Sequence, residues 1–196
     1  MTDTHVFMVV FQIADAREPD EYAVRLYGDG GVEEVMLAGP DSAGVFEVEF
    51  ERVDRSFPAA VLSAVRDLER VFPEATILRV EPDDLVTIAA IAERVGRSHE
   101  SVRLLVRGER GPGGFPAPAG KLDAKTQAWR WAEVAQWFET YIGPVPGAEH
   151  AAFLAAVNDI LDLRRLAGDA IDTPDIAQAM ASLLPEQLTV AARAAV

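Results

Sequence analysis

The chain has 196 residues, enough for one large or two modest domains, and its 49% hydrophobic content excludes bulk disorder. It contains no cysteine, which excludes disulfides and thiolate metal sites and fits a reducing compartment. The net charge of −14 argues against a protein that binds nucleic acid over its whole surface.

The basic residues are concentrated in the middle of the chain. Met1–Leu85 contains 7 basic and 19 acidic residues, whereas Val86–Arg130 contains 8 basic and 4 acidic residues. Trp131–Val196 is acidic again, with 3 basic and 9 acidic residues. One basic segment between two acidic ones predicts that any contact with nucleic acid is confined to a single face.

No stretch of the sequence suggests a membrane protein. The longest apolar run, Val6–Phe11, is far shorter than the roughly 20 residues of a spanning helix. The N-terminus, MTDTH, lacks the basic start of a signal peptide. We therefore expect a cytoplasmic, nucleoid-associated protein without membrane contact.

Residues 1–83 have the pattern of a small α+β domain. Helices are expected to begin at Pro19 and after Ser56, which can cap the second one. The expected strands are His5–Ile13, Val32–Leu37, Val45–Val53 and Ala75–Val80. The order strand, helix, strand, strand, helix, strand predicts a ferredoxin-like domain with both helices on one face of an antiparallel sheet. Such a domain can sense a small-molecule effector or form a dimer contact.

Three features of the chain invite a chemical interpretation that we do not favour. The glycine-rich Gly28–Gly31 is not followed by a helix start, so it is interpreted as a turn and not as a phosphate loop. The acidic residues between Asp15 and Glu21 have no histidine nearby and are interpreted as solvated surface. His5 and His150 lack partner motifs. We predict no metal, no cofactor and no enzymatic activity.

The stretch from Asp84 to Ile142 carries the prediction of function. An apolar helix, capped by Asp84 or Thr87, ends where Gly96 permits a left-handed turn. Ser98 can cap the helix that follows, and two helices joined by a tight turn form a helix-turn-helix.

The Gly/Pro-rich segment Arg110–Gly120 cannot be helical and predicts a two-stranded wing with a basic tip, anchored by Phe115. Trp129 and Trp131 alternate around Arg130 as in a strand, and at least one is expected in the core.

The outward side chains of the second helix and the wing are the candidate DNA-binding residues. Arg103 suits guanine through its paired N–H donors, whereas serine hydroxyls and a helix N-terminus suit phosphate oxygens. Glu100 either accepts from cytosine or opposes phosphate, and His99 is either a contact or an idle surface residue. The candidate set is Arg97, Ser98, His99, Glu100, Ser101, Arg103, Arg107, Arg110, Lys121, Lys125 and Arg130.

Three pieces of this stretch, IAAIAERVGRSHESVRLLV, GGFPAP and WRWAEVAQWF, occur in a specific order. They resemble the winged helix-turn-helix of excisionase, AlpA-like and MerR-type bacterial DNA-binding domains, which share an "FP.P" entry to the wing and a "WR…V..W" return into a helix. The resemblance covers roughly Asp84–Ile142, and it implies a DNA-binding domain over residues 84–143. His99-Glu100 departs from the family, where such positions often carry a basic or neutral pair.

Residues 148–196 predict helices that are too short to form a core alone, so they are expected to pack on the rest of the chain or on a second copy. A homodimer is favoured because paired reading heads recognise paired half-sites. The sequence thus predicts a transcriptional regulator that binds specific double-stranded DNA, with the second helix in the major groove. The alternatives are an excisionase-like architectural factor that bends DNA and a protein-interaction adaptor that binds no DNA.

Overall fold

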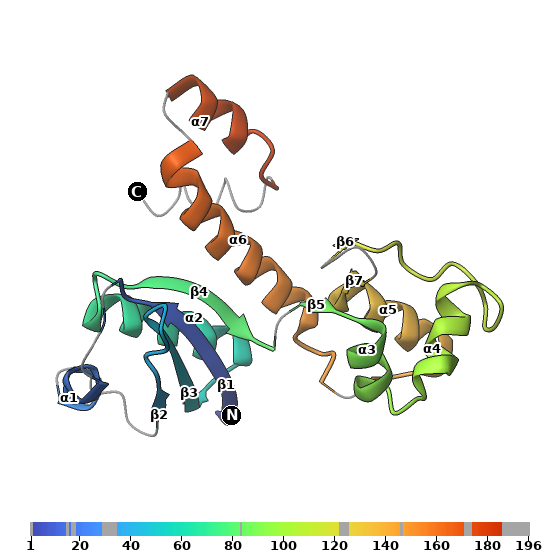
Figure 1. Ribbon diagram of the computed structural model, residues 1–196, viewed down its shortest axis with the longest axis horizontal. Coiled ribbons are helices and arrows are strands. Elements are labelled where there is room, and N and C mark those ends of the chain that lie inside the picture. Colours follow the sequence, from blue (N-terminus) through green and yellow to red (C-terminus); the bar gives the residue numbers. More distant parts are fainter. Residues whose placement is uncertain are drawn as a thin grey trace. The chain divides into compact units, whose positions relative to one another are not determined.

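The computed structural model describes residues 2–14, 16, 19–28, 35–82, 84–121, 126–145, 147–170 and 174–185, and it combines helices with two antiparallel sheets (Figure 1). The mixed α+β class is therefore confirmed. The chain divides into two compact units, Met1–Leu161 and Asp162–Val196. Within the described residues, no helix has the length and apolarity that a membrane span requires.

The strands are β1 (Asp3–Gln12), β2 (Val35–Ala38), β3 (Val45–Asp54), β4 (Thr76–Glu81), β5 (Leu85–Val86), β6 (Gly120–Lys121) and β7 (Gln127–Arg130). The helices are α1 (Pro19–Gly28), α2 (Phe57–Val71), α3 (Ile88–Arg94), α4 (His99–Val106), α5 (Trp131–Ile142), α6 (Ala151–Ala170) and α7 (Pro174–Ala181).

The larger sheet has the strand order β2-β3-β1-β4, with every neighbouring pair antiparallel. Its longest pairing runs from Asp3↔Asp54 to Gln12↔Val45. Strand β3 confirms the predicted alternation, because Phe46, Val48 and Phe50 are buried while the glutamates between them are exposed. One face of this sheet is therefore apolar and the other carries a row of carboxylates.

Helix α2 covers the apolar face. It begins where the Ser56 hydroxyl accepts a hydrogen bond from the Ala59 amide at 3.3 Å, and Pro58 occupies its first turn. Its buried stripe, which includes Val61 and Leu68, joins the phenylalanines of β1 and β3 in one hydrophobic cluster. Leu26 of α1 and three residues of α6 belong to the same cluster.

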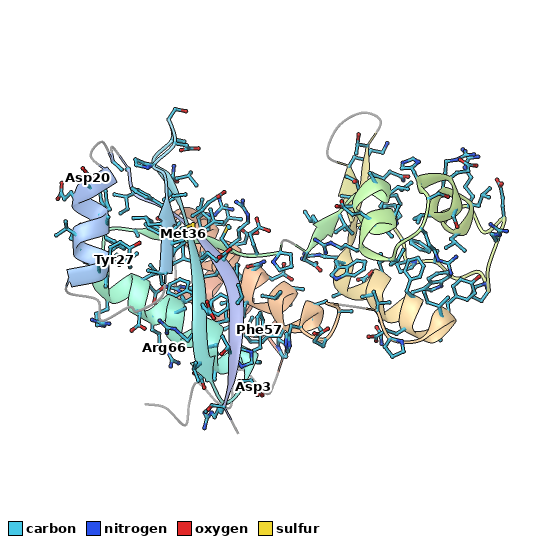
Figure 2. All side chains as sticks on the ribbon, turned by 90° about the horizontal axis from the view of Figure 1, so that it is seen from below. Asp3, Asp20, Tyr27, Met36, Phe57 and Arg66 are labelled. Carbon is cyan, nitrogen blue, oxygen red and sulfur yellow. The ribbon has the colours of Figure 1, made fainter. Side chains whose placement is uncertain are left out.

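Phe57, the first residue of α2 (labelled in Figure 2), packs against the rings of two histidines. The His150 ring stacks on it with a centroid separation of 4.1 Å, and the His5 ring meets it edge-on at 6.0 Å. Aromatic packing therefore accounts for the position of both histidines that had no partner motif in the sequence.

A second hydrophobic cluster forms from α3, α4, α5, the strands β5 and β7 of the small sheet and Ala151 at the start of α6. Its largest fully buried side chains are Trp129, Phe138, Ile91 and Leu105. Trp131 is also buried, so both tryptophans around Arg130 are core residues. Phe115 packs against the rings of Trp129, Trp137 and Phe138, which confirms its predicted role as an anchor of the loop.

The structure decides the bounds of three helices. Of the two predicted caps, Thr87 is confirmed for α3, because the helix begins after it and its hydroxyl accepts from the Ala90 amide, while Leu85–Val86 pairs with β7. Trp131 begins α5 instead of continuing the strand, and its amide donates to the Asp84 carbonyl. Helix α6 continues through Gly168 to Ala170, since one glycine costs only about 1 kcal/mol relative to alanine.

Several predicted features fall on residues outside the described ranges. These are Asp15, Glu18, Val32, Lys125 and most of the Gly28–Gly31 turn.

Asn158 of α6 completes the edge of the larger sheet. Its carboxamide oxygen accepts from the Val80 amide at 2.8 Å, and its carboxamide nitrogen donates to the Val80 carbonyl at 3.0 Å. Val80 lies on β4, the terminal strand of the sheet, so the side chain supplies the two hydrogen bonds that a further strand would make. Both residues are buried, so water does not replace these bonds.

We expect Asn158→Ala to lower the free energy of unfolding by about 1–3 kcal/mol, because it leaves two buried backbone groups of Val80 without partners. Urea denaturation followed by circular dichroism measures the change. Ala156→Ser, at an exposed position of the same helix, is the matched control and should change stability by less than about 0.5 kcal/mol. Equal stability of the two variants would contradict this role of Asn158.

Candidate nucleic-acid interface

Helices α3 and α4 form a compact pair joined by a tight turn. Gly96 adopts φ 63°, the left-handed conformation that glycine tolerates, and the Arg97 amide bonds back to the Ala92 carbonyl at 2.8 Å. The Ser98 hydroxyl then accepts from the Ser101 amide at 3.2 Å and starts α4. The sequence therefore predicted this turn and this cap correctly.

Burial orients α4. Val102 and Leu105 are fully buried, so the opposite side of the helix carries the polar candidates. His99 and Glu100 are exposed, whereas Ser101 and Arg103 are half-buried. The N-terminal half of α4 thus presents a short polar surface.

Arg103 is already engaged on this surface. Its Nε donates to Glu100 Oε2 at 2.7 Å and its Nη2 donates to Glu100 Oε1 at 2.5 Å. The hydrogen bond from Arg103 lowers the pKa of Glu100 below its ordinary value of 4.5, so Glu100 stays ionised at neutral pH. An incoming guanine or phosphate must therefore displace Glu100 from the guanidinium.

Arg97 and Arg107 also have partners within the protein. The Arg97 guanidinium lies 5.6 Å from the centroid of the Tyr141 ring and 6.0 Å from that of Phe138, as in cation–π contacts. Arg107 approaches Glu109 at 3.8 Å, and both side chains are more than half exposed. Such a surface pair contributes little to stability and is easily exchanged for another anion.

Arg130 is held by two carboxylates. Its Nη1 lies 3.2 Å from Asp84 Oδ2 and 2.9 Å from Asp159 Oδ1. Burial lowers the pKa of Arg130, but the hydrogen bonds to Asp159 and Asp84 outweigh it, and the pKa is raised. These contacts direct the guanidinium toward the protein.

Asp84 also caps α5. Residue Arg130 precedes that helix and provides no side-chain cap, whereas Asp84 Oδ1 accepts from the Ala132 amide at 3.0 Å. The Asp84 carbonyl accepts from the Trp131 amide at 2.6 Å. The sequence suggested Asp84 or Thr87 as the cap of the nearer helix; Thr87 caps that helix, and Asp84 caps one whose bonded residue is 48 positions away. No local pattern identifies a cap supplied across such a distance.

Two further candidate cations, Arg110 and Lys121, are exposed. Arg110 follows α4 in the Gly/Pro-rich loop, and Lys121 lies on β6. No ion pair of either side chain occurs within the part of the chain that the structure describes. They are consequently the candidates with the most freely available charge.

A cleft of about 320 Å³ lies between the starts of α3 and α4 and strand β7. His99, the one candidate residue in its lining, faces it together with Thr126 and Gln127. The cleft is also lined by Thr87, Ile88, Ala89 and Trp129. Sequence analysis missed Thr126 and Gln127, because uncharged polar residues beside a turn carry no distinctive signal.

Comparison of the chain with protein-family models, with curated proteins and with solved structures found no match. Within the described residues, no group of three or more His, Asp or Glu side chains is arranged to hold a metal ion. The interpretation of this interface therefore rests on its own residues.

We expect Asp84→Ala to lower the free energy of unfolding by roughly 1–2 kcal/mol, because α5 loses its cap. Asp84→Asn keeps an acceptor oxygen for the Ala132 amide and should cost less. Urea denaturation followed by tryptophan fluorescence suits the measurement, since Trp129 and Trp131 adjoin Asp84. If Asp84→Asn lowered the free energy of unfolding as much as Asp84→Ala, the ion pair between Asp84 and Arg130 would contribute more to stability than the helix cap.

Proposed function

We propose that this protein is a regulator of transcription that binds specific double-stranded DNA through a winged helix-turn-helix. In this proposal α4 is the recognition helix, β6 and β7 form the wing, and the βαββαβ segment before them is a ferredoxin-like domain. The protein acts in the cytoplasm, at the nucleoid, and catalyses no reaction. The strand order β2-β3-β1-β4, with α2 on the apolar face, supports the ferredoxin-like assignment.

The observation that carries the proposal is the presentation of α4. Its eight residues span about 12 Å, comparable to the width of the major groove. Its capped N-terminal turn bears exposed His99 and Glu100 and is followed in the chain by the exposed cations Arg110 and Lys121. Exposed polar residues at the start of a short helix are those that reach base edges, while cations beside it suit phosphates.

The candidates then fall into two groups. Arg103 and His99 are proposed to contact bases, whereas Arg107, Arg110 and Lys121 are proposed to contact phosphates. Arg97 and Arg130 are proposed as positioning residues, because their guanidinium groups already pack on aromatic rings or carboxylates of the protein. Ser98 and Ser101 complete the helix start, and Lys125 lies outside the described residues.

A homodimer is part of the proposal. Within the second unit the described part of α6 and the segment after α7 expose leucines, including Leu166 at 58% and Leu183 at 83%. Exposed leucines on short helices favour burial against a partner, and a second copy would supply a second reading head. The ferredoxin-like domain remains the proposed site for a small-molecule effector.

We expect selection from a random duplex pool to yield a preferred sequence, with affinity that falls steeply between 50 and 200 mM salt, about −0.9 in log–log slope per phosphate contact. Lys121→Ala and Arg110→Ala should weaken all duplexes alike and reduce the slope by about 1 each. Arg103→Ala should cost about 1–3 kcal/mol at one base pair. Fluorescence anisotropy measures each affinity.

Arg66→Ala is the matched control, because Arg66 is an exposed arginine of α2 (labelled in Figure 2). It should leave duplex affinity unchanged. Absence of duplex binding at low salt would contradict the proposal and favour the protein-interaction adaptor. Binding that bends DNA without sequence preference would favour the architectural factor.

We expect Glu100→Gln to raise the affinity for random duplexes several-fold at low salt, because it frees Arg103 and removes a carboxylate that repels phosphate. The preferred duplex should gain less, so the ratio of specific to random affinity should fall. Glu93→Gln, an exposed carboxylate of α3, is the control. Equal gains for both variants would mean that net charge, and not the Glu100–Arg103 pair, governs selectivity.

A further inference from the structure

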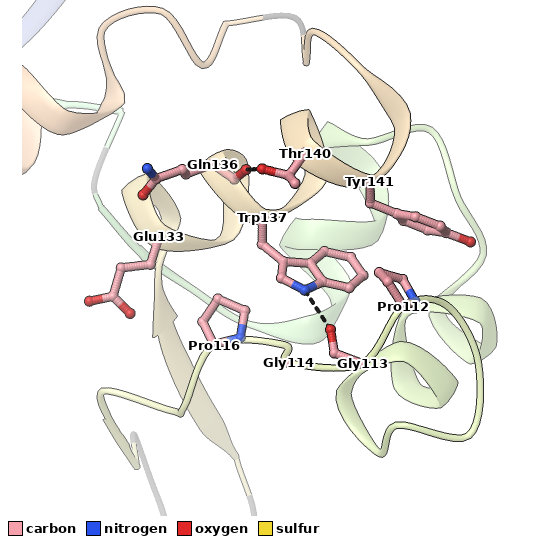
Figure 3. Close-up of a pocket in the computed structure, with 9 residues that line it drawn as sticks. All are labelled: Pro112, Gly113, Gly114, Pro116, Glu133, Gln136, Trp137, Thr140 and Tyr141. Atoms are coloured by element: carbon pink, nitrogen blue, oxygen red, sulfur yellow. Dashed lines mark hydrogen bonds between the residues drawn. The ribbon is translucent and has the colours of Figure 1, made fainter.

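A pocket of about 760 Å³ opens between α5 and the Gly/Pro-rich loop that follows α4 (Figure 3). Its volume lies within the roughly 300–1,000 Å³ that small-molecule sites occupy. Its lining comprises Pro112, Gly113, Gly114, Pro116, Glu133, Gln136, Trp137, Thr140 and Tyr141. The pocket differs from the cleft beside His99, with which it shares no lining residue.

The aromatic wall of this pocket is held in place before any ligand arrives. The Trp137 indole N–H donates to the Gly113 carbonyl at 3.0 Å, a bond drawn in Figure 3, so its polar group is already satisfied. The rings of Phe115 and Tyr141 lie 4.9 and 5.2 Å from the Trp137 ring. Trp137 therefore offers a ligand its ring surface and not a hydrogen-bond donor.

At Gly111 the loop packs so closely on Leu105 of α4 that an added side chain would force Leu105 to move. A Cβ atom there would meet Leu105 at 2.7 Å and would approach the Tyr141 and Trp137 rings at 3.6 and 3.7 Å. The positive φ of Gly111, 79°, also disfavours any other residue. The Gly/Pro-rich loop is thus in close contact with the aromatic residues of α5 at this position.

The charge of the lining selects the ligand. Glu133 is its one charged residue, and it is exposed on the first turn of α5. The other polar groups are neutral, and the Thr140 hydroxyl already donates to the Gln136 carbonyl. A carboxylate beside aromatic and proline surface favours a cation with an apolar body and disfavours an anion.

The surrounding residues show the same chemistry with the protein's own cations. The Arg94 guanidinium lies 4.9 Å from the Trp131 ring centroid, and that of Arg97 lies 5.6 Å from Tyr141. Within the described residues, no guanidinium or ammonium group lies over Trp137. Trp137, a ring of the type that binds cations most strongly, therefore lines the pocket without a cation of the described residues over it.

We propose that this pocket binds a small organic cation, an ammonium or guanidinium attached to an apolar or aromatic body, between Trp137, Tyr141 and Glu133. Glu133, the one charged residue of the lining, disfavours phosphate-bearing ligands by repelling their negative charge. It does not depend on the DNA-binding proposal, since none of its lining residues is a candidate DNA contact.

The test is isothermal titration calorimetry of the full chain with benzyltrimethylammonium, compared with neutral benzyl alcohol and anionic phenylacetate. We expect the cation to bind at least tenfold more tightly than either of the others. Amide chemical shifts should change at Gly113, Gly114 and Thr140. Equal affinity for the cation and the alcohol, or shifts confined to other regions, would overturn the proposal.

Glu133→Gln should lower the affinity for benzyltrimethylammonium about 3- to 10-fold and leave the affinity for benzyl alcohol unchanged. Glu139→Gln, an exposed carboxylate of α5 outside the lining, is the matched control and should retain the affinity of the original protein. Trp137→Phe should also weaken the cation while keeping an aromatic ring in the wall. If both glutamate variants lost the same affinity for the cation, net charge alone would explain the effect, and the assigned site would be overturned.

Titration with a short arginine-containing peptide tests whether the ligand of the pocket is a small free cation or the cationic side chain of a partner protein. The proposal expects benzyltrimethylammonium to bind without any peptide backbone. Binding of the peptide alone would overturn the small-molecule assignment and identify the pocket as a protein-docking site.

Discussion

Asp84 occupies the junction on which the order of the helical part of the first unit depends. Its carboxylate and carbonyl accept the first amides of α5, and the same carboxylate holds Arg130. Because the neighbouring residues 85–86 pair with β7, one residue connects the start of this region to its last helix. The side chain is almost fully buried, so its lone pairs must be satisfied by the protein, and the Ala132 amide and the Arg130 guanidinium do so.

Most of the arginines discussed above also have partners within the protein. The basic residues that give the central segment its excess are largely used inside the protein: Arg130 by carboxylates, Arg97 by aromatic rings and Arg103 by Glu100. Counting basic residues in the sequence therefore overestimates the number of positive charges that are available to a ligand. For the proposed DNA contact, this arrangement favours selectivity over affinity, because each engaged arginine must exchange one partner for another.

The aromatic residues link the two proposed binding sites. Tyr141 lines the pocket on α5 and also lies under the guanidinium of Arg97, which directly precedes the cap of α4. A cation held by Trp137 would thus be one aromatic ring away from the start of the proposed recognition helix. The pocket is built on α5, whose buried Val134 and Phe138 belong to the same hydrophobic cluster as Val102 and Leu105 of α4.

The sequence by itself determined the local elements whose signals lie within a few residues. The alternation of Phe46, Val48 and Phe50, the caps at Ser56 and Ser98 and the turn at Gly96 follow from side-chain period, hydroxyl acceptors and a positive φ. Only the tertiary structure decided that Asp84 caps a distant helix, that Asn158 completes the edge of a sheet and that Arg130 is directed toward the protein. These roles depend on partners between 29 and 78 positions away, and a residue's identity carries no record of which buried group it must satisfy.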